Sequence, residues 1–457
     1  MTFAILSRHC ILASEADYSR RGRSMNPKMM EYLVCPYDGT EDLKLHIFND
    51  AQNEAFESKR IEVLDGIIVC ENCLRWYPIV DGIPTILPDE LRCDEKDQSN
   101  KDVSFLKKWE EEVPDTIRLT GKPINLSNVR SRKLVSSSQK TKSLKIGQHE
   151  DLSNQAAKEY ELHETLNPGT RFIMKKEEEL VFKSANSLVQ KKVALDLGCG
   201  TGRHAIELAK DFEFVIAVDI SHEMVYEGRR ICNESGILNI DFIIGDAEHL
   251  MFQRRTFDLV VAGFGLLSFV FNLSWTANKI SDLLRLGGIL FTTVYNKRFR
   301  AFQKILRILP WQSPLAISWP NSKPETMIVQ FGKKFEIHSK PFEADEFRDI
   351  LRKAGVESVR TSCSPALLPL LPKRLLTNRK VYRKAVFLEK IIARLMTRLS
   401  WLPPRGAYIL VIGKRVSRIC PPHKFSKNVV FSTKELIKEE LICNSCGFHQ
   451  VDEFFCS

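Results

Sequence analysis

The chain has 457 residues, of which 44% are hydrophobic and 27% are charged, so it can bury a sizeable core and is expected to divide into two or three folded units. No apolar run reaches the length that a membrane-spanning helix needs. The net charge of +10 is moderate for this length, so it permits an anionic partner without demonstrating one. The 12 cysteines come without a convincing export signal, which predicts reduced thiols in a cytoplasmic protein and argues against a disulfide framework.

The first segment of the chain, residues 1–28, is predicted to be a leader without regular structure. Arg8 and His9 interrupt its apolar stretch and leave it too short for the core of a signal peptide. Three methionines stand immediately before the first patterned segment, so residues 1–24 are either a disordered leader or an over-long gene start.

Residues 29–92 show short alternating strands and turns that contain glycine, which predicts a small β-rich module. Its sequences LVCPYDGT and IVCENCLRWYPIVDGIPTILP resemble the small zinc-ribbon-like activator subunit that partners several RNA and release-factor methyltransferases. This resemblance implies packing against a methyltransferase in the same chain, by covering apolar surface or by extending a sheet edge. A tetrahedral zinc site needs two ligand pairs. Cys70 and Cys73 form one pair, and Cys35 forms the other with Asp38, which stands where a second cysteine is usual; the alternative is a fold kept without its metal.

Residues 93–165 are rich in Ser, Lys, Gln and Asn and poor in aromatic residues, which is typical of a polar linker, with one helix near FLKKWEEE. Within this part, residues 117–148 contain many Lys and Arg and no acid. Such a stretch can contact phosphates or an anionic membrane surface. No chemistry is expected in the linker itself.

Residues 166–417 alternate apolar strands with amphipathic helices, the pattern of a parallel sheet that is covered on both faces. In ALDLGCGTGRHAIELAK, an apolar strand runs into a turn with three glycines, and a helix follows the turn. The next strand ends at Asp219, where a carboxylate can accept hydrogen bonds from both hydroxyls of a ribose. A third strand ends at Asp246, whose carboxylate can reach an adenine amino group. FDLVVAGFG and GGILFTTVYN supply two further strands.

These motifs, in this order and spacing, resemble the class I S-adenosylmethionine-dependent methyltransferases, close to the branch that contains quinone-biosynthesis methyltransferases. The resemblance covers about half of the chain and implies an α/β fold with a seven-stranded, Rossmann-like sheet whose last strand is inserted antiparallel. The cofactor contacts that it implies are Gly198, Gly200 and Gly202 at the methionine moiety, Asp196 near its ammonium, Asp219 at the ribose, and Asp246 with Ala247 around the adenine. The alternative is an NAD-binding turn, in which the third glycine would stand one position later.

Methyl transfer from a sulfonium to a nucleophile is an in-line displacement, which a protein promotes mainly by aligning the reactants and by excluding water. No universal catalytic residue is therefore required. Three side chains near the expected cofactor face are candidates for a general base, with a purely structural role as the alternative: His204, His249 and Tyr295.

The segment AGFGLLSFVFN, after the fourth strand, lacks the Asn-Pro-Pro-aromatic signature that grips planar amines in several methyltransferases. A wide apolar mouth would remain, which favours carbon, oxygen or flexible nitrogen acceptors over a flipped adenine. The residues expected to line this mouth, unless they pack in the core, are Phe264, Leu266, Leu267 and Phe269.

The rest of the domain is predicted to form a helix that stops at Gly355, a sixth strand in VESVRTSC and a seventh in RGAYILVIGKR. An insertion between these strands contains a basic amphipathic helix at 380–400, with Leu and Ile on one face and Lys and Arg on another. Such a helix contacts an anionic membrane surface or phosphates, or it is a lid with a solvated basic face.

Residues 418–457 form a separate tail that carries cysteine and histidine. CPPH and CNSC contain two ligand pairs separated by a hairpin-sized segment, which predicts a zinc ribbon. The predicted ligands are Cys420, His423, Cys443 and Cys446. His449 and Cys456 are spare ligands, and reduced cysteines in a frayed tail are the alternative.

Two functions follow as hypotheses. The first is a methyltransferase that uses S-adenosylmethionine to methylate a small-molecule or lipid-like acceptor, as the apolar mouth and the quinone-branch likeness indicate. The second is an RNA methyltransferase, for tRNA or rRNA, with its activator module fused in the same chain, as the module, the basic linker and the tail indicate. A non-catalytic binding module is disfavoured because every cofactor motif is intact.

Overall fold

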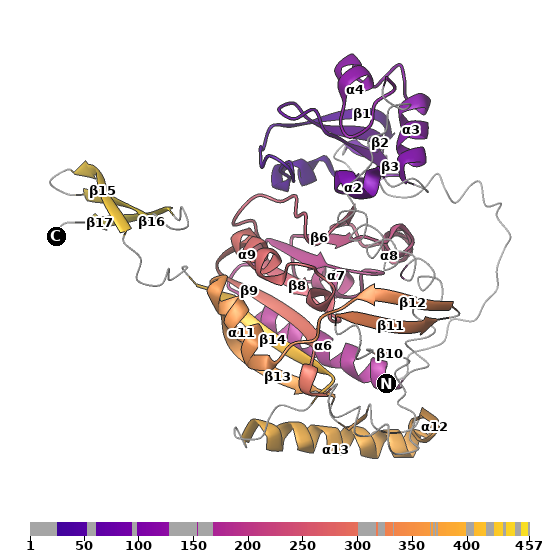
Figure 1. Ribbon diagram of the computed structural model, residues 1–457, viewed down its shortest axis with the longest axis vertical. Helices are drawn as coiled ribbons and strands as arrows, with labels where there is room; N and C mark the ends of the chain where they lie inside the picture. The colour runs from indigo at the N-terminus through magenta and orange to yellow at the C-terminus, as the bar shows by residue number, and fades with distance from the viewer. Residues whose placement is uncertain are drawn as a thin grey trace. The chain divides into compact units, whose positions relative to one another are not determined.

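The structure is a computed structural model of the chain, and it divides into two compact units after Arg415 (Figure 1). The described residues are 25–52, 61–93, 98–127, 153, 168–299, 317–318, 325–331, 333–365, 367–368, 371, 373–398, 406–416, 425–432, 436–443 and 449–455. No helix within these ranges is both long enough and apolar enough to cross a membrane.

A seven-stranded sheet forms the centre of the larger unit. Its strands are β5 (Val193–Leu197), β6 (Phe214–Asp219), β7 (Ile240–Gly245), β8 (Phe257–Ala262), β9 (Leu284–Tyr295), β13 (Val356–Ser364) and β14 (Tyr408–Arg415). They lie in the order β7-β6-β5-β8-β9-β14-β13. β14 pairs antiparallel with both of its neighbours, whereas the pairs from β7 to β9 are parallel. The predicted seven-stranded sheet with an antiparallel last strand is confirmed.

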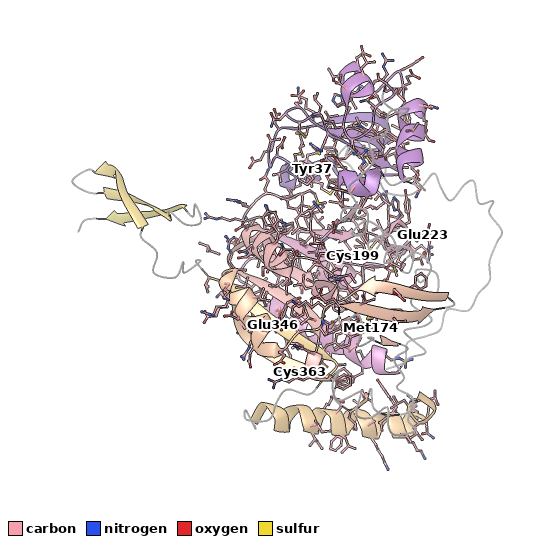
Figure 2. All side chains as sticks on the ribbon, viewed as in Figure 1. Tyr37, Met174, Cys199, Glu223, Glu346 and Cys363 are labelled. Atoms are coloured by element: carbon pink, nitrogen blue, oxygen red, sulfur yellow. The ribbon has the colours of Figure 1, made fainter. Side chains whose placement is uncertain are left out.

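Helices cover both faces of this sheet. They are α6 (Pro168–Asn186), α7 (Arg203–Leu208), α8 (His222–Glu234), α9 (Leu273–Leu283) and α11 (Ala344–Lys353). Alternate residues of β5 divide between two cores, because Leu195 packs with α9 and α11 while Ala194 packs with α6, α7 and α8. Figure 2 shows side chains filling the space between the sheet and its helices. The strand order reverses between β6 and β8, on either side of β5, so a crevice is expected at the carboxyl ends of these strands.

The N-terminal module is an antiparallel meander that begins earlier than the predicted boundary. Its elements are the 3-10 helix η2 (Pro27–Tyr32) and the strands β1 (Leu43–Gln52), β2 (Ile61–Cys70), β3 (Trp76–Val80) and β4 (Ile83–Ile86). Met25 is buried and exchanges two backbone hydrogen bonds of 3.0 Å with Val63. The prediction of a leader through residue 28 is therefore wrong for its last four residues, and residues 1–24 lie outside the described part.

The module extends the large sheet. β4 pairs in parallel with β7, with Thr85 opposite Ile244, so the two sheets join into one of 11 strands. The N–H of Val34 donates to the carbonyl of Met251 at 2.8 Å, and Met29 packs in the core between the module and the sheet. This pairing confirms the expectation that the module packs in the same chain and extends a sheet edge. The physical reason is that β7 would otherwise be an unpaired edge strand.

The segment after the module contains more structure than a linker. It forms α2 (Asp89–Arg92), α3 (Gln98–Lys108) and α4 (Asp115–Thr120). Phe105 and Ile117 pack against Trp76 of β3, and Nε1 of that tryptophan donates to the carbonyl of Ile124 at 2.8 Å. A folded part thus replaces the predicted linker up to residue 127, because a few apolar residues at helical spacing outweigh a polar composition. Residues 128–165 fall outside the described part except for residue 153.

Two insertions and the tail complete the fold. The small strands β10 (Ile317–Ser318), β11 (Thr326–Phe331) and β12 (Lys333–His338) form an antiparallel sheet, and α12 (Lys373–Leu376) and α13 (Arg379–Arg398) lie between β13 and β14 in the sequence. The smaller unit is an antiparallel sheet of β15 (Phe425–Ser432), β16 (Leu436–Cys443) and β17 (His449–Phe455). Of the predicted tail ligands, Cys420, His423 and Cys446 lie outside the described residues, as does the side chain of Cys443. The zinc ribbon there stays a prediction.

Candidate functional site

The turn after β5 has a backbone that glycine makes possible. Gly198, Gly200 and Gly202 have φ angles of +69°, +54° and +81°, in the left-handed region that other residues rarely adopt. The N–H of Gly198 donates to the carbonyl of Val218 at 2.7 Å, which ties the turn to β6. A Cβ atom on Gly198 would lie 2.7 Å from Cδ1 of Leu266, so glycine lets the turn approach the loop after β8 closely.

Asp219 stands at the carboxyl end of β6 and is held by the glycine turn. Its Oδ2 accepts a hydrogen bond from the N–H of Gly200 at 2.8 Å, and its Oδ1 accepts one from the N–H of Ser221 at 2.9 Å. Burial raises the pKa of Asp219, while these two N–H groups act in the opposite direction. The carboxylate is therefore fixed on the wall of a pocket, and each oxygen keeps capacity to accept a further hydrogen bond.

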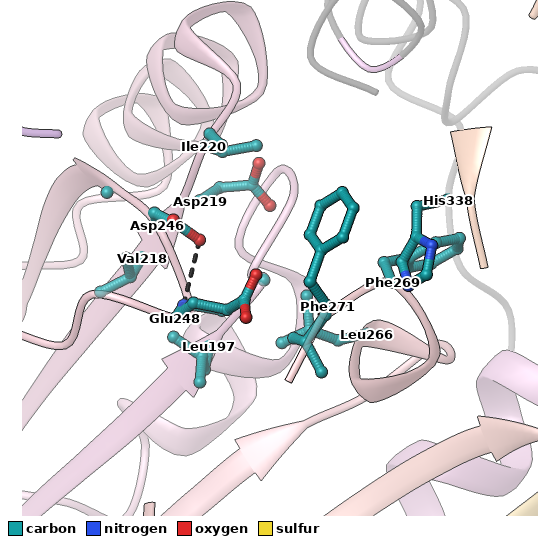
Figure 3. Close-up of a pocket in the computed structure, with 14 residues that line it drawn as sticks. Leu197, Val218, Asp219, Ile220, Asp246, Glu248, Leu266, Phe269, Phe271 and His338 are labelled. Atoms are coloured by element: carbon teal, nitrogen blue, oxygen red, sulfur yellow. Dashed lines mark hydrogen bonds between the residues drawn. The ribbon is translucent and has the colours of Figure 1, made fainter. Parts of the chain in front are cut away.

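This pocket opens at the carboxyl ends of β5, β6 and β7, beside the loop after β8 (Figure 3). Its lining residues are Leu197, Gly198, Val218, Asp219, Ile220, Gly245, Asp246, Ala247, Glu248, Leu266, Phe269, Val270, Phe271 and His338. Six predicted site residues are among them, namely Gly198, Asp219, Asp246, Ala247, Leu266 and Phe269. The strand tips contribute carboxylates to the lining, and the loop after β8 contributes an apolar wall.

Asp246 organises the turn after β7. Its Oδ1 accepts a hydrogen bond from the N–H of Glu248 at 3.0 Å, and its Oδ2 lies 2.7 Å from Nδ1 of His249. Oε1 of Glu248 accepts from the N–H of Asn272 at 3.0 Å, which connects the turn to the start of α9. His249 does not line the pocket and is held by Asp246, so its predicted role as a base gains no support from its position.

Asp196 lies outside the pocket lining, although the resemblance implies a contact with the cofactor. Its carboxylate is buried, and Oδ2 accepts a hydrogen bond from the N–H of Ala205 in the first turn of α7 at 2.9 Å. Burial raises the pKa of Asp196. In this arrangement Asp196 stabilises the helix that follows the glycine turn, because a carboxylate at a helix N-terminus satisfies unpaired N–H groups.

The four residues predicted to form an apolar mouth separate into two pairs. Leu266 and Phe269 line the pocket, whereas Leu267 is fully buried in the core shared with α9 and α11. Phe264 has a φ angle of +50°, and its ring centroid lies 6.1 Å from that of Tyr408, away from the lining. Hydrophobicity alone does not tell which side of a loop faces a cavity.

Eight lining residues were not predicted, and three of them carry a charged or ring side chain: Glu248, Phe271 and His338. The rings of Phe271 and His338 stack with their centroids 4.3 Å apart and their planes within 10°. Glu248 directs its carboxylate toward Phe271 (Figure 3). His338 ends β12, and the alternating apolar pattern of TMIVQF and KKFEIH is the sequence signal that would have revealed this hairpin.

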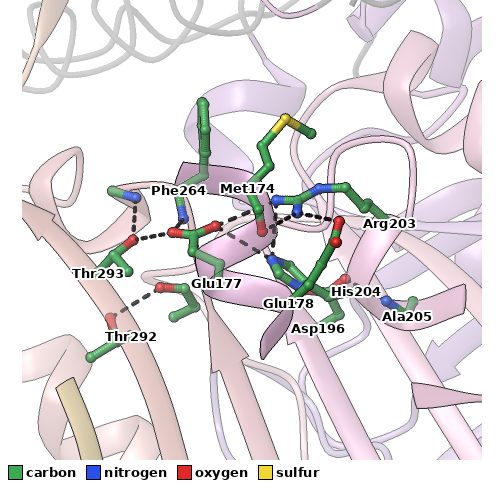
Figure 4. A network of polar contacts seen from close by, with 12 residues as sticks. Met174, Glu177, Glu178, Asp196, Arg203, His204, Ala205, Phe264, Thr292 and Thr293 are labelled. Carbon is green, nitrogen blue, oxygen red and sulfur yellow. Dashed lines mark hydrogen bonds and ion pairs between the residues drawn. The ribbon is translucent and has the colours of Figure 1, made fainter. Parts of the chain in front are cut away.

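A buried carboxylate anchors the loop after β8. Oε1 of Glu177, on α6, accepts hydrogen bonds from the N–H of Phe264 and from Oγ1 of Thr293, both at 2.9 Å (Figure 4). Its Oε2 lies 3.4 Å from Nη2 of Arg203 and 3.5 Å from Nε2 of His204. Burial opposes the ionisation of Glu177, but His204, Arg203 and the N–H of Phe264 outweigh it and lower the pKa of Glu177. His204 is therefore a partner of Glu177, and it does not line the pocket.

Tyr295, the third candidate base, is buried near the end of β9. Its ring centroid lies 5.0 Å from that of Tyr408 and 5.8 Å from that of Phe269. Burial raises the pKa of Tyr295 to about 12, so its hydroxyl stays protonated near neutral pH and is unsuited to accept a proton. None of the three predicted bases lies on the described lining of the pocket.

The module brings together the four predicted metal ligands. The ligand atoms of Cys35, Asp38, Cys70 and Cys73 all lie within 4.8 Å of one another. The Sγ atoms of Cys35 and Cys73 are 3.6 Å apart, and Sγ of Cys70 lies 3.4 Å from Oδ2 of Asp38. Burial raises the pKa of the Cys35 and Cys70 thiols, and a bound cation would act in the opposite direction because it stabilises thiolates. Three sulfurs and one carboxylate at this spacing fit a tetrahedral zinc ion.

Comparison with protein families assigns two parts of the chain. Residues 194–288 match the methyltransferase domain family, and residues 26–82 match the family of Trm112p-like proteins. These two ranges contain the glycine turn with Asp219 and Asp246, and the four clustered metal ligands. Both parts of the site thus have counterparts in known families.

Two curated relatives are similar to the central part of the chain. The ubiquinone/menaquinone biosynthesis C-methyltransferase UbiE of Hydrogenovibrio crunogenus is 38% identical over 23% of this chain and 42% of its own length. The aklanonic acid methyltransferase DauC of a Streptomyces species is 34% identical over 37% of this chain and 77% of its own length. The chain spans 65% of the length of a further UbiE, from Wigglesworthia glossinidia brevipalpis, at 29% identity.

Among solved structures, a complex that contains the Haloferax volcanii Trm112 methyltransferase activator is similar at 15% identity, with a TM-score of 0.38. The similarity covers 58% of this chain and 98% of that one.

Proposed function

We propose that this chain methylates a small-molecule or lipid-like acceptor. The premise is that it belongs to the class I S-adenosylmethionine-dependent methyltransferases and carries a Trm112-like module. The observation that carries the proposal is the pocket at the tips of β5, β6 and β7, where carboxylates on one side face an apolar wall on the other. Carboxylates at strand tips suit a nucleoside, and an apolar wall suits a hydrophobic acceptor.

S-adenosylmethionine, when bound, supplies an electrophilic methyl group on a sulfonium. The side chains present fit the nucleoside part, because Asp219 keeps acceptor capacity that the ribose would use, and Asp246 and Ala247 line the same pocket, where they would contact the adenine. The turn at Gly198 lines the same pocket, and its lack of a side chain leaves room for Leu266 of the apolar wall to pack against it. Asp196 would contribute to binding indirectly, because it stabilises the helix that follows the turn.

The acceptor side of the pocket is formed by Leu266, Phe269 and Phe271. These side chains would exclude water and align an apolar acceptor with the methyl group, which is the main contribution a protein makes to this displacement. His338 lines the same pocket and stacks on Phe271, and it is the side chain that we propose would take up a proton from the acceptor. The names of the relatives support this acceptor class, since one is a quinone-biosynthesis C-methyltransferase and another an aklanonic acid methyltransferase.

A second candidate is an RNA methyltransferase, for tRNA or rRNA, that carries its activator in the same chain. The observation that favours it is the Trm112-like module, whose strand β4 continues the sheet at β7. RNA binding through several phosphates would weaken steeply as the salt concentration rises, whereas binding of an apolar acceptor would not.

The test is the transfer of labelled methyl groups to fractionated cell material. The purified chain is incubated with radiolabelled S-adenosylmethionine and, separately, with a lipid extract, polar metabolites, and total tRNA and rRNA. We expect label in the lipid or metabolite fraction. Label in RNA alone would establish the second candidate, and a wild-type chain that binds S-adenosylmethionine but labels none of the fractions would contradict both.

A matched pair of variants ties the activity to the pocket. Asp219→Asn removes the charge at the tip of β6, and we expect S-adenosylmethionine to bind roughly 10- to 100-fold more weakly, because charge-assisted hydrogen bonds are lost. Asp211→Asn is the control, since that carboxylate pairs with Lys191 at 3.5 Å outside the pocket lining. Equal affinities for the two variants would refute the assignment of the cofactor site.

A further inference from the structure

Helix α13 has one face packed on the protein and one face open. Ala385 and Glu389 are buried, and Tyr382 and Val386 pack in a small cluster with Phe172 of α6. The carboxylate of Glu389 accepts hydrogen bonds from the N–H groups of two residues before α12, at 2.7 and 3.2 Å. The single acid of the helix is therefore turned inward and used, so it places no negative charge on the open side.

The exposed face of α13 combines apolar and basic side chains. We define this face by the exposed residues of α13 with described side chains: Arg379, Lys380, Arg383, Lys384, Phe387, Leu388, Lys390 and Ile391. Phe387 is 64% exposed, Leu388 49% and Ile391 36%, and no described residue covers them. Large hydrophobic side chains that are scattered singly over a surface need no explanation, but three within five positions of one helix form a patch.

Positive charge accumulates around this patch. The face has five cations, which make no ion pair within the described part of the chain: Arg379, Lys380, Arg383, Lys384 and Lys390. The pKa of Lys176, on α6, is lowered first by burial and then by the like charges of Arg360, Lys183 and Lys390, against the opposite effect of Glu179. Three neighbouring elements, α6, β13 and α13, thus contribute cations to the same side of the unit.

This combination selects among possible occupants. A second copy of the same face would bring two sets of uncompensated cations together, which is unfavourable. RNA would neutralise the cations but would leave the aliphatic side chains Leu388 and Ile391 without a base-stacking role. A bilayer with anionic headgroups satisfies both components, because apolar side chains enter the acyl boundary while Lys and Arg contact phosphates.

We propose that the exposed face of α13 docks onto the surface of an anionic phospholipid bilayer. The helix would lie in the plane of the headgroups, since no described helix can cross the membrane. α6 connects this surface to the pocket: Phe172 packs beneath α13, and Glu177 holds the N–H of Phe264 at the start of the loop that carries Leu266 and Phe269. Docking would bring a methyltransferase with an apolar pocket to the bilayer, in which lipid-like acceptors dissolve. Only this connection between docking and methylation rests on the proposed function.

The test is flotation of the full-length chain with vesicles, in which no substrate or cofactor is needed. Vesicles of phosphatidylcholine alone are compared with vesicles of an equal mixture of phosphatidylcholine and phosphatidylglycerol. We expect the chain to float with the mixture and not with phosphatidylcholine alone, and to be released partly by high salt. Equal flotation with both, or with neither, would overturn the proposal.

A matched pair of double variants identifies the face. Phe387→Ser/Lys384→Gln removes one apolar and one basic side chain from α13, and we expect vesicle binding to fall by roughly tenfold or more. The control is Trp275→Ser/Lys279→Gln on α9, where Trp275 is 51% exposed and Nζ of Lys279 lies 4.6 Å from its ring centre. Phe387, Lys384 and Trp275 are exposed and Lys279 is half-buried, so the melting temperature should change little in either variant. Vesicle binding that falls equally in both, or in neither, would refute the assignment to α13.

Two further measurements exclude the other occupants. If light scattering shows a dimer that Phe387→Ser/Lys384→Gln converts to a monomer, the face is an interface between copies. If the same variant loses binding to a single-stranded RNA of mixed sequence while vesicles do not bind, the face is an RNA surface. Titration with S-adenosylmethionine should be the same for wild type and variant, so a failure of membrane docking and a failure of the proposed methyl transfer remain distinguishable.

Discussion

Oε1 of Glu177 accepts a hydrogen bond from the N–H of Phe264 at 2.9 Å, although 87 residues separate the two in the sequence. The bond joins α6 to the second residue of the loop that forms the apolar wall of the pocket. Because Glu177 is fully buried, its charge is balanced only by the partners around it, Arg203 and His204 among them.

Replacing Glu177 by Gln should destabilise the protein in a pH-dependent way. We expect Glu177→Gln to lower the free energy of unfolding near neutral pH by about 3 kcal/mol, because it leaves buried partners without their charge. The folded-state pKa of Glu177 is lowered, so its contribution is fully present above the unfolded-state pKa of about 4.3 and is lost as the pH falls through the folded-state pKa. Denaturant unfolding across this pH range measures both effects.

The neighbouring Glu178 provides the control for that experiment. It is part-exposed and pairs with Nη1 of Arg203 at 3.0 Å, so Glu178→Gln should lower the free energy of unfolding by less than about 1 kcal/mol. If both variants were equally stable at every pH, the anchoring role of Glu177 would be disproved.

Substitution of Gly198 should impair cofactor binding more than stability. Gly198→Ala places a Cβ atom 2.7 Å from Cδ1 of Leu266, so that side chain, which lines the pocket, has to move. Gly236→Ala is matched in backbone strain, with φ +70° against +69°, but has no atom within 4 Å of the added Cβ. We expect both to lose about 1–2 kcal/mol of stability and only Gly198→Ala to weaken S-adenosylmethionine binding, by roughly tenfold. Calorimetric titration checks this, and equal affinities would contradict it.

The cluster in the module should bind zinc. We expect about one zinc ion per module in metal analysis of a chain purified without chelator, and less for Cys73→Ser, because each tetrahedral ligand is needed. Asp38→Cys should bind zinc more tightly, since it completes a four-thiolate set. Cys93→Ser is the control, because Cys93 lies outside the cluster. Zinc content that is unaffected by Cys73→Ser would rule out this site; the tail cysteines must be replaced in parallel to separate the two metal predictions.

His338 should matter for turnover and not for cofactor binding. We expect His338→Ala to lower kcat at least roughly tenfold while the Kd for S-adenosylmethionine stays within twofold of wild type, because a positioned acid or base contributes about 100-fold or more to proton transfer. Asp219→Asn should behave in the opposite way, with weaker cofactor binding. His338→Gln separates the roles of shape and proton transfer, since it keeps a polar side chain against Phe271. A cofactor Kd that rises with His338→Ala would place His338 on the cofactor side of the pocket and contradict its assignment to the acceptor side.

Local sequence was sufficient for the parts of the site that lie within one strand and its following turn. The glycine turn is predictable because glycine adopts the positive φ angles found at Gly198, Gly200 and Gly202 far more readily than other residues do. Asp219 and Asp246 are predictable as strand-end carboxylates, because the apolar pattern of a strand ends beside each of them and a turn follows. The four ligands of the module are predictable in the same way, since Cys70 and Cys73 sit in one tight turn and Cys35 and Asp38 in another.

The structure alone revealed which residues of distant segments share a surface. His204 and His249 looked like candidate bases, yet each is held by a carboxylate, Glu177 or Asp246, and neither lines the pocket. His338 lines it because a hairpin from the insertion folds back beside the loop after β8. No local pattern encodes such a meeting, because it depends on how segments far apart in the chain pack.

By itself, the sequence determined the backbone of the glycine turn, the strands with carboxylates at their tips and the paired candidate metal ligands, because steric limits on φ and the spacing of neighbouring residues act within a few positions. Tertiary structure decided that β4 of the module continues the sheet at β7, that Leu266 faces the pocket while Leu267 faces the core, and that the acid of α13 turns inward. These outcomes depend on burying apolar surface and on pairing backbone groups between distant segments. Such contacts exist only once the chain has folded.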